Sequence, residues 1–274
     1  MLSHEIRGAA DVRLHAMETG RREGPAFLFV HGMSQCGLAW MRQLDSNLAD
    51  SYRLVAVDLR GHGLSDRPEQ GYDDSRLWAD DLRAVIETLE LEDIVLCGWS
   101  YGPLILLDYL RHYGEDRIRG LNFAGGITKL GSAEAMSVLT PEFVALAPGL
   151  FSTDVAESVR ALDALVELCY DCSLRPEDRF RMLGYGVSVS PLVRRSMLSR
   201  RLDNDDLITR LRIPLLVTHG TGDRVVRPSV IERQMAGFAQ LEVRLIPSAG
   251  HACFWDDPGI YNRCLREFAA TLQA

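Results

Sequence analysis

The sequence predicts an α/β fold, in which helices cover both faces of a doubly wound, mostly parallel sheet. Two observations predict it: short apolar runs that stop at polar, glycine or proline residues, and amphipathic helical patterns between those runs. Near-continuous apolar strands are typical of a parallel sheet buried on both faces, and their alternation with helices is typical of a doubly wound sheet. The runs span residues 26–30, 53–57, 93–97, 215–218 and 243–246.

Further strands and helices follow from the same patterns. Residues 13–19 precede the first run and predict an antiparallel edge strand, and residues 118–123 predict another strand. Helices are expected at 74–91, where apolar residues recur at helical spacing, and at 101–113. A third helix begins at Asp257, whose side chain can cap it and which precedes a proline that the first helical turn tolerates.

The alternation of strands and helices breaks between residues 127 and 206, where no clear buried strand occurs. A structureless loop of this length is uncommon in a compact domain, so we expect a helical insertion that covers one end of the sheet. Its helices are expected at 141–147, 154–168, 176–184 and 191–201. The α/β core then consists of residues 1–126 and 207–274, and the insertion of residues 127–206.

The charge balance limits the partners of this chain. Its 274 residues include 30 Lys and Arg and 38 Asp and Glu, which gives a formal net charge of −8. A broad nucleic-acid surface needs clustered basic charge, so we expect no nucleic-acid partner. No apolar stretch reaches the roughly 18 to 20 residues that span a bilayer. Residues 1–8 lack the apolar region of a secretory signal, so a cytoplasmic location is expected.

Cysteine and lysine usage narrows the chemistry further. The six cysteines are expected to be reduced thiols. Cys169 and Cys172 form a CxxC pair without a second pair or a nearby histidine cluster, so we expect no metal site there or elsewhere. Lys129 is the only lysine among 30 basic residues, and this excess of arginine is typical of a high-GC bacterial genome.

The segment Gly98-Trp99-Ser100-Tyr101-Gly102 is the strongest local signal in the sequence. It lies between a predicted strand and a predicted helix, the context in which G-x-S-x-G marks a nucleophilic serine. A serine in so sharp a turn has strained backbone angles, and the positions two before and two after it must be small. The helix N-terminus beneath it favours developing negative charge. We therefore predict that Ser100 is a nucleophile.

A nucleophilic serine needs a base, and three of the seven histidines follow Ser100 in the chain. His112 lies late in the helix that begins after Ser100, so it cannot reach back. His219 ends a predicted strand and precedes the candidate acid. His251 is the only histidine after Asp223, and folds with this serine turn place the serine, the acid and the histidine in that order. We predict that His251 is the base.

Asp223 is the predicted acid. It lies in a loop that leaves a strand, where its carboxylate can orient the imidazole and stabilise its charged form. Asp256 and Asp257 are closer to His251 in the sequence, but they fit better as caps of the last helix. Asp58 also ends a strand, but it precedes the serine in the chain.

Acyl transfer also needs hydrogen-bond donors for an oxyanion. The backbone N–H of Tyr101, directly after the serine, is one predicted donor, and that of Met33, in the loop after the first long strand, is the other. His31 in the same loop is expected to hold the loop by hydrogen bonding. The side chains of Met33, Trp99 and Trp255 are candidate walls of the substrate pocket.

With these motifs in order, the chain resembles the α/β-hydrolase superfamily over nearly its whole length. Residues 58–65, Asp-Leu-Arg-Gly-His-Gly-Leu-Ser, look like the D-x-R-G-x-G-x-S turn of one branch of that superfamily. This branch contains esterases, cofactor-free haloperoxidases (perhydrolases) and meta-cleavage hydrolases. The resemblance implies structural roles for Arg60 and the glycines of this turn, and it implies that His62 is not catalytic.

The resemblance also assigns roles to the candidate site residues. It implies that residues 127–206 are the helical cap of the family, which shapes the substrate pocket. It matches Ser100 with the nucleophile, Asp223 with the acid and His251 with the base. Met33 and Tyr101 match the oxyanion positions.

The resemblance predicts a serine hydrolase that cleaves small-molecule carboxylic esters without a metal or organic cofactor. Ser100 argues against dehalogenases and epoxide hydrolases, which use aspartate at that position. Met33 and Tyr101 argue against a perhydrolase, because perhydrolases often have Trp and Met at these two positions. A lactonase, a thioesterase or a carbon–carbon bond hydrolase with the same triad is the alternative. A perhydrolase, a non-catalytic binding protein and a hydroxynitrile lyase fit the sequence less well. Hydroxynitrile lyases with this triad use a lysine of the cap, and Lys129, at the start of the cap, is the one lysine available.

Overall fold

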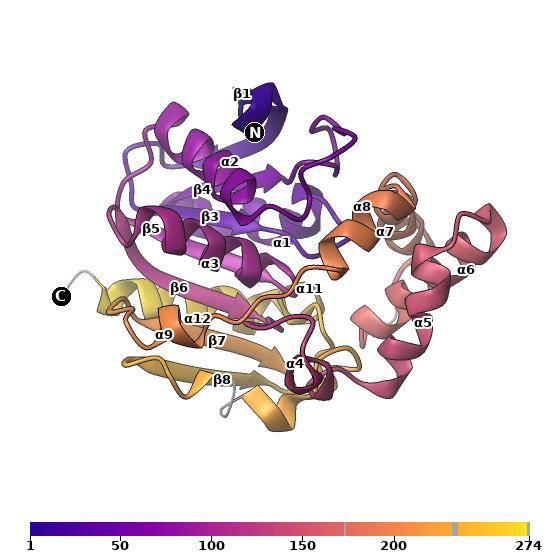
Figure 1. Cartoon of the computed structure of the whole chain (residues 1–274). Coiled ribbons are helices and arrows are strands. Elements are labelled where there is room, and N and C mark those ends of the chain that lie inside the picture. Colours follow the sequence, from indigo (N-terminus) through magenta and orange to yellow (C-terminus); the bar gives the residue numbers. More distant parts are fainter. Residues whose placement is uncertain (173, 232–234, 273–274) are drawn as a thin grey trace.

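A computed structural model describes residues 1–172, 174–231 and 235–272, and its strands form one eight-stranded sheet (Figure 1). The strands lie side by side in the order β1-β2-β4-β3-β5-β6-β7-β8. Their bounds are β1 Leu2–Arg7, β2 Arg13–Gly20, β3 Ala26–Val30, β4 Arg53–Asp58, β5 Ile94–Trp99, β6 Ile118–Ala124, β7 Leu215–Gly220 and β8 Leu241–Ile246. β1 pairs antiparallel with β2 and β2 with β4, and every other pairing is parallel. The predicted mostly parallel α/β fold is therefore confirmed.

The strand order places a change of direction at the centre of the sheet. From β3 the chain first builds outward to β4, then crosses over to β5 on the other side of β3. In open α/β sheets, ligands bind at the carboxyl ends of the strands where the strand order reverses. Here those ends belong to β3 and β5, where Val30 is the register partner of Gly98.

Two edge-strand expectations are wrong. Residues 13–19 were expected at the edge, but β1 lies outside β2, with Ser3 opposite Met17. β1 has no apolar run because it is exposed along most of its length, with only Ile6 buried. At the opposite edge, β8 was expected to be buried on both faces, but Arg244 and Leu245 are exposed because no strand covers its outer side.

Helices pack on both faces of the sheet (Figure 1). On one face, α2 packs against α3, and α3 lies over β5; on the other face, α1, α11 and α12 pack together. The predicted helices at 74–91 and 101–113 correspond to α2 and α3. The bounds are α1 Met41–Leu44, α2 Ser75–Thr88, α3 Gly102–Tyr113, α9 Asp205–Ile208, α11 Cys253–Asp256 and α12 Pro258–Thr271.

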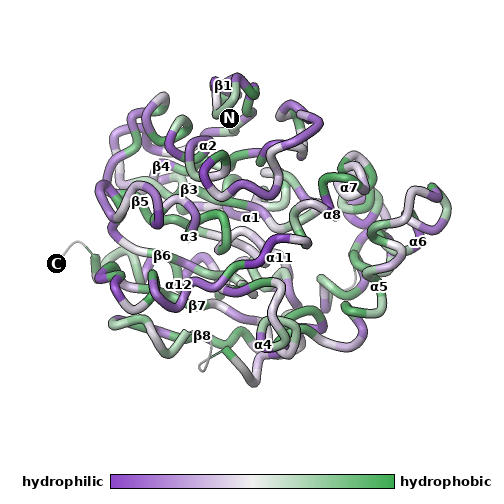
Figure 2. Tube along the Cα trace, in the orientation of Figure 1, coloured by the Kyte–Doolittle hydropathy of each residue, from purple (hydrophilic) through white to green (hydrophobic). Residues whose placement is uncertain are grey.

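The remaining helices form a separate group beyond the carboxyl ends of the strands (Figure 1). They are α4 Ala133–Ser137, α5 Pro141–Phe151, α6 Val155–Cys169, α7 Pro176–Val187 and α8 Pro191–Leu198. Four of them coincide with predicted helices, whereas the short α4 was not predicted. An isolated bridge between Leu130 and Leu202 joins the two ends of this segment. Along α6 the hydropathy alternates (Figure 2), as in a helix with one buried face.

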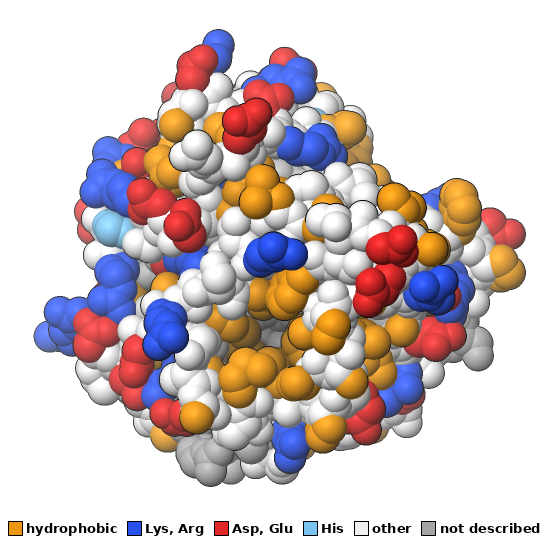
Figure 3. All heavy atoms as spheres, turned by 45° about the vertical axis from the view of Figure 1, so that its right-hand side comes forward, with side chains coloured by type: hydrophobic (Ala, Val, Ile, Leu, Met, Phe, Trp, Pro, Cys, Tyr) orange, Lys and Arg blue, Asp and Glu red, His pale blue; other side chains and the backbone are white. Residues whose placement is uncertain are grey.

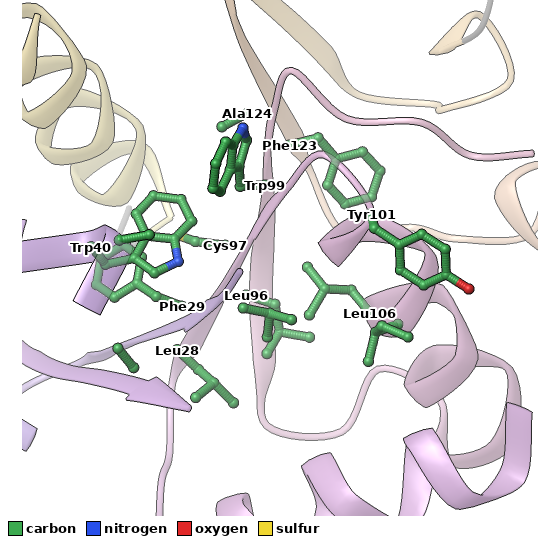
Figure 4. Packing of buried hydrophobic residues seen from close by; sticks show 14 of the residues in the cluster. Leu28, Phe29, Trp40, Leu96, Cys97, Trp99, Tyr101, Leu106, Phe123 and Ala124 are labelled. Carbon is green, nitrogen blue, oxygen red and sulfur yellow. The ribbon is translucent and has the colours of Figure 1, made fainter. Parts of the chain in front are cut away.

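The central strands β3 and β5 are buried in a core that fixes their carboxyl ends. Leu28 and Phe29 from β3 and Leu96 and Trp99 from β5 are each at most 1% exposed. Figure 4 shows these side chains among neighbouring aromatic rings, and the rings of Phe29 and Trp40 lie 4.9 Å apart between centroids. A core packed this closely holds the backbone rigidly. In the described part of the chain, no helix has the length and apolar character needed to cross a membrane.

Candidate active site

Ser100 lies in a strained turn between β5 and α3. Its φ angle is +58°, in the left-handed region that costs a non-glycine residue about 1–3 kcal/mol. A Cβ at Gly98 would lie 2.7 Å from the backbone nitrogen of Pro103, and a Cβ at Gly102 would lie 2.6 Å from the carbonyl oxygen of Val30. Because neither position has room for a side chain, the two glycines allow the turn to form.

His251 and Asp223 come from loops after β8 and β7 and form a direct hydrogen bond. The Nδ1 of His251 lies 2.8 Å from Oδ2 of Asp223, and both side chains are buried. A carboxylate can only accept, so Nδ1–H donates and Nε2 is left as an acceptor. This Nε2 is buried and has no hydrogen-bond partner among the described residues. Ser100 and His251 line the same cavity, although within the described residues no hydrogen bond joins them.

The Asp223 carboxylate is held by four donors. Oδ1 accepts from the amides of Val225 and Val226 at 2.7 and 2.9 Å, and Oδ2 also lies 2.9 Å from Nε2 of His219. Burial alone would raise the pKa of Asp223, but the charge of His251 and the hydrogen bonds from His219 and His251 lower it well below its usual range. The carboxylate therefore stays ionised at neutral pH.

His219 is a site residue whose place the sequence did not reveal. It was considered as an alternative base, but it is fully buried and does not line the cavity with Ser100. Its Nε2 faces Asp223 and the carbonyl oxygen of Val226. The spacing His219-x-x-x-Asp223, which starts at the end of β7, was the available signal, because it brings a donor close to the acid.

The loop that carries His251 is fixed by hydrogen bonds to its backbone. Trp99 Nε1–H donates to the carbonyl oxygen of His251 at 3.0 Å. Asp256, one of the alternative acids, instead accepts from the amide of Gly250 at 2.7 Å. Asp257 caps α12 through the amide of Ile260, as expected. Asp256 was also expected to cap that helix, and its contact with the loop corrects this expectation.

The loop after β3 lies directly against the serine turn. A Cβ at Gly32 would lie 2.9 Å from the Cβ of Ser100, so the two backbones approach closely here. The backbone amides of Met33 and Tyr101 donate no hydrogen bond to other described residues. Two amides beside the serine are thus available to a bound group, as the sequence predicted for an oxyanion.

Two buried histidines hold this loop in place. His31 donates from Nδ1 to the carbonyl oxygen of Gly32 at 2.7 Å and accepts at Nε2 from the amide of Leu59. His62 hydrogen-bonds through Nδ1 to the carbonyl oxygen of Arg60 and accepts at Nε2 from the amide of Ser34. Burial lowers the pKa of both, that of His62 to about 3, so both rings are neutral. Their bonds fit the structural roles expected from the sequence.

A cavity of about 50 Å³ lies between the serine turn and the helical segment. Viewed with that segment in front, the surface has a hollow around which hydrophobic side chains gather (Figure 3). The walls are apolar apart from a few groups beside Ser100. The lining residues are Gly32, Met33, Gln35, Trp99, Ser100, Tyr101, Ile127, Leu130, Leu139, Phe143, Leu165, Cys169, Leu198, Val225, Val226 and His251.

The residues that the sequence suggested for the pocket have different outcomes at this cavity. Met33 and Trp99 line it, but Trp255 lies outside it, with its ring under the guanidinium of Arg42 at 4.5 Å. Lys129 does not line it either, because its ammonium pairs with Asp205 at 2.6 Å. Trp255 is buried, but its ring packs against Arg42 and not against the cavity.

The CxxC cysteines are free thiols. Cys169 lines the cavity, and burial raises the pKa of its thiol and that of Cys172, the latter to about 12. A protonated thiol is a poor nucleophile. Among the described residues, no group of three or more His, Cys, Asp and Glu side chains is placed to hold a metal ion.

One family model and three known proteins are similar to this chain over most of its length. The sequence model of the alpha/beta hydrolase family matches residues 27–263. The crystal structure of the esterase RhEst1 from Rhodococcus sp. ECU1013 is 34% identical, with a TM-score of 0.92, and the match covers 99% of this chain and 100% of that one. A putative aryl esterase from Burkholderia cenocepacia is 27% identical, with a TM-score of 0.89 and 99% of both chains covered. The AB hydrolase superfamily protein YisY of Bacillus subtilis is 26% identical, over 98% of this chain and 99% of its own.

The serine turn predicts a contrast between two glycine substitutions. Gly98→Ala places a methyl group against backbone, so we expect the free energy of unfolding to fall by about 1–3 kcal/mol. Gly184→Ala is the matched control, because a Cβ at this exposed helical glycine would have nothing within 4 Å. Alanine should there raise the free energy of unfolding by up to about 1 kcal/mol. Urea unfolding measures both values, and a Gly98→Ala protein as stable as the parent would contradict the tight turn.

Proposed function

This chain belongs to the alpha/beta hydrolase family, and from that premise we propose that it is a serine hydrolase of carboxylic esters. One observation carries the proposal: His251 lines the same cavity as Ser100, its Nε2 has no partner among the described residues, and its Nδ1 is held by ionised Asp223. An imidazole in this state is ready to take a proton from a hydroxyl group. Likeness to an esterase at 34% identity supports ester substrates.

In the proposed reaction, Oγ of Ser100 attacks the ester carbonyl carbon as Nε2 of His251 takes the hydroxyl proton. A bond forms between Oγ and the carbonyl carbon, and the carbonyl π electrons move onto oxygen. Asp223 stays ionised and stabilises the imidazolium through its bond to Nδ1. The left-handed turn at Ser100 supports this role because it holds the serine clear of the sheet.

The amides of Met33 and Tyr101 are proposed to bind the oxyanion. Both lie beside Ser100 and have no protein acceptor among the described residues. Losing one such donor typically raises the barrier by about 2.7–4 kcal/mol. The tetrahedral intermediate then collapses, and His251 donates its proton to the leaving alkoxide. A water that His251 deprotonates attacks the acyl-enzyme, releases the carboxylic acid and restores Ser100.

Residues 127–206 are proposed to act as a cap over the core of residues 1–126 and 207–274. Their side chains supply much of the apolar wall, with no charged group among the lining residues of the segment. Uncharged, apolar substituents on the ester are therefore favoured. The cavity of about 50 Å³ has room for a few waters, whereas ligand sites span about 300–1,000 Å³, so substrate entry requires the cap to shift.

Serine-directed labelling tests the nucleophile. We expect a fluorophosphonate to add once to the parent protein, at the peptide that contains Ser100. Ser100→Ala should not be labelled, and its rate of ester hydrolysis should be at least about 10³-fold lower than that of the parent. Ser137→Ala removes an exposed serine on α4 and should label like the parent. Peptide mapping by mass spectrometry locates the label. A label on another residue, or ester hydrolysis that survives Ser100→Ala, would refute the proposal.

Two aspartate substitutions test the acid. Asp223→Asn removes the acceptor of the His251 Nδ1 proton, so the imidazole favours the wrong tautomer and kcat should fall by about 10³–10⁴-fold. Asp257→Asn is the control near the same loop, because asparagine caps a helix about as well as aspartate, and its kcat should stay within about twofold. Steady-state kinetics on a simple ester measure both. If Asp223→Asn keeps kcat within tenfold of the parent, Asp223 is not the acid.

A further inference from the structure

Two residues that line the cavity each have a buried side-chain atom without a hydrogen-bond partner among the described residues. Several buried polar atoms of the described residues are unpaired, and among them only Nε2 of His251 and Oε1 of Gln35 belong to residues that line the cavity with Ser100. The proposed reaction explains the first, because Nε2 receives the serine proton. It does not use the second.

Gln35 occupies a place where an unpaired amide is costly. Its side chain is 4% exposed, and the side-chain amide forms no hydrogen bond with any described residue. Leaving a buried acceptor unpaired costs about 1–3 kcal/mol, and native proteins seldom leave one without a reason. Most other residues that line the cavity, such as Leu130 and Phe143, are apolar and have no side-chain donor. Because Gln35 lines the cavity, a group that enters the cavity can supply the missing partner.

The backbone around Gln35 is fixed by hydrogen bonds, so the side chain projects from a defined place. The loop that carries it is held by the bonds of His31 and His62. Two residues further on, the amide of Gly37 donates to Oδ1 of Asp58 at 2.6 Å. An acceptor on a rigid loop binds with little loss of conformational freedom.

We propose that Gln35 is a specificity-determining residue whose Oε1 accepts a hydrogen bond from an N–H or O–H group of the substrate. The preferred esters then combine an apolar, uncharged body with one donor, such as a secondary amide or a hydroxyl group, near the scissile carbonyl. This inference rests on the proposed ester hydrolysis and adds a substrate class to it. A site built around a hydrogen bond rejects an analogue that lacks the donor, because the protein group is then left unpaired.

A pair of substrates that differ by one donor tests the inference. The pair consists of the ethyl ester of N-butanoylglycine and its N-methyl counterpart, which keeps the carbonyl acceptors but has no N–H. We expect kcat/KM, divided by the rate of hydroxide-catalysed hydrolysis of the same ester, to be at least about tenfold higher for the N–H ester. Gln35→Met keeps the length of the side chain but has no amide. In this variant the normalised kcat/KM of the N–H ester, divided by that of the N-methyl ester, should fall close to one.

A second cavity variant separates the hydrogen bond from a general change in packing. Leu198→Met alters another lining residue without a polar group, and the ratio should there stay near that of the parent. A parent protein that hydrolyses both esters equally, or a preference that persists in Gln35→Met, would overturn the role of Gln35. If Ser100-dependent hydrolysis of ethyl butanoate continues in that case, the serine hydrolase stands and only the substrate class is wrong. Failure to hydrolyse any of these esters would overturn both proposals.

Discussion

The close contact between the ends of β3 and β5 determines where the groups of the candidate site lie. Val30 and Gly98 are register partners in the two strands, and the carbonyl oxygen of Val30 leaves no room for a side chain at Gly102. The serine turn therefore packs against the loop after β3, so Gly32 and Ser100 approach closely and Met33 and Tyr101 line the same cavity as Ser100. The strained φ angle of Ser100 persists because the closely packed core on both sides of the turn fixes the conformation of its backbone.

Charge is distributed around this contact in a way that suits acyl transfer. Asp223 is kept ionised, whereas the nearby His31 and His62 are neutral and bond only to backbone. The remaining walls are mostly apolar. In such a low-dielectric environment hydrogen bonds to a developing oxyanion are stronger than in water. The same environment makes an amide without a partner costly at Gln35, which favours the proposed bond to a substrate donor.

The sequence predicted the features that depend on local steric rules. Ser100 was identifiable from its flanking glycines, and Asp223 and His251 from their order along the chain; the structure brings the latter two into contact. Features that depend on the surroundings were missed. β1 has too little buried apolar surface to form a pattern, and Trp255 faces away although it is close to His251 in sequence. The unpaired state of Gln35 becomes visible only when every neighbouring donor is known.

The most direct test is a crystal structure of the covalent adduct between a phosphonate and the full chain. We expect a bond from Oγ of Ser100 to phosphorus, with the phosphonyl oxygen about 2.7–3.1 Å from the amide nitrogens of both Met33 and Tyr101. Nε2 of His251 should face the ester oxygen of the adduct. A phosphonyl oxygen that points away from both amides, or phosphorus bonded to a different residue, would contradict the account.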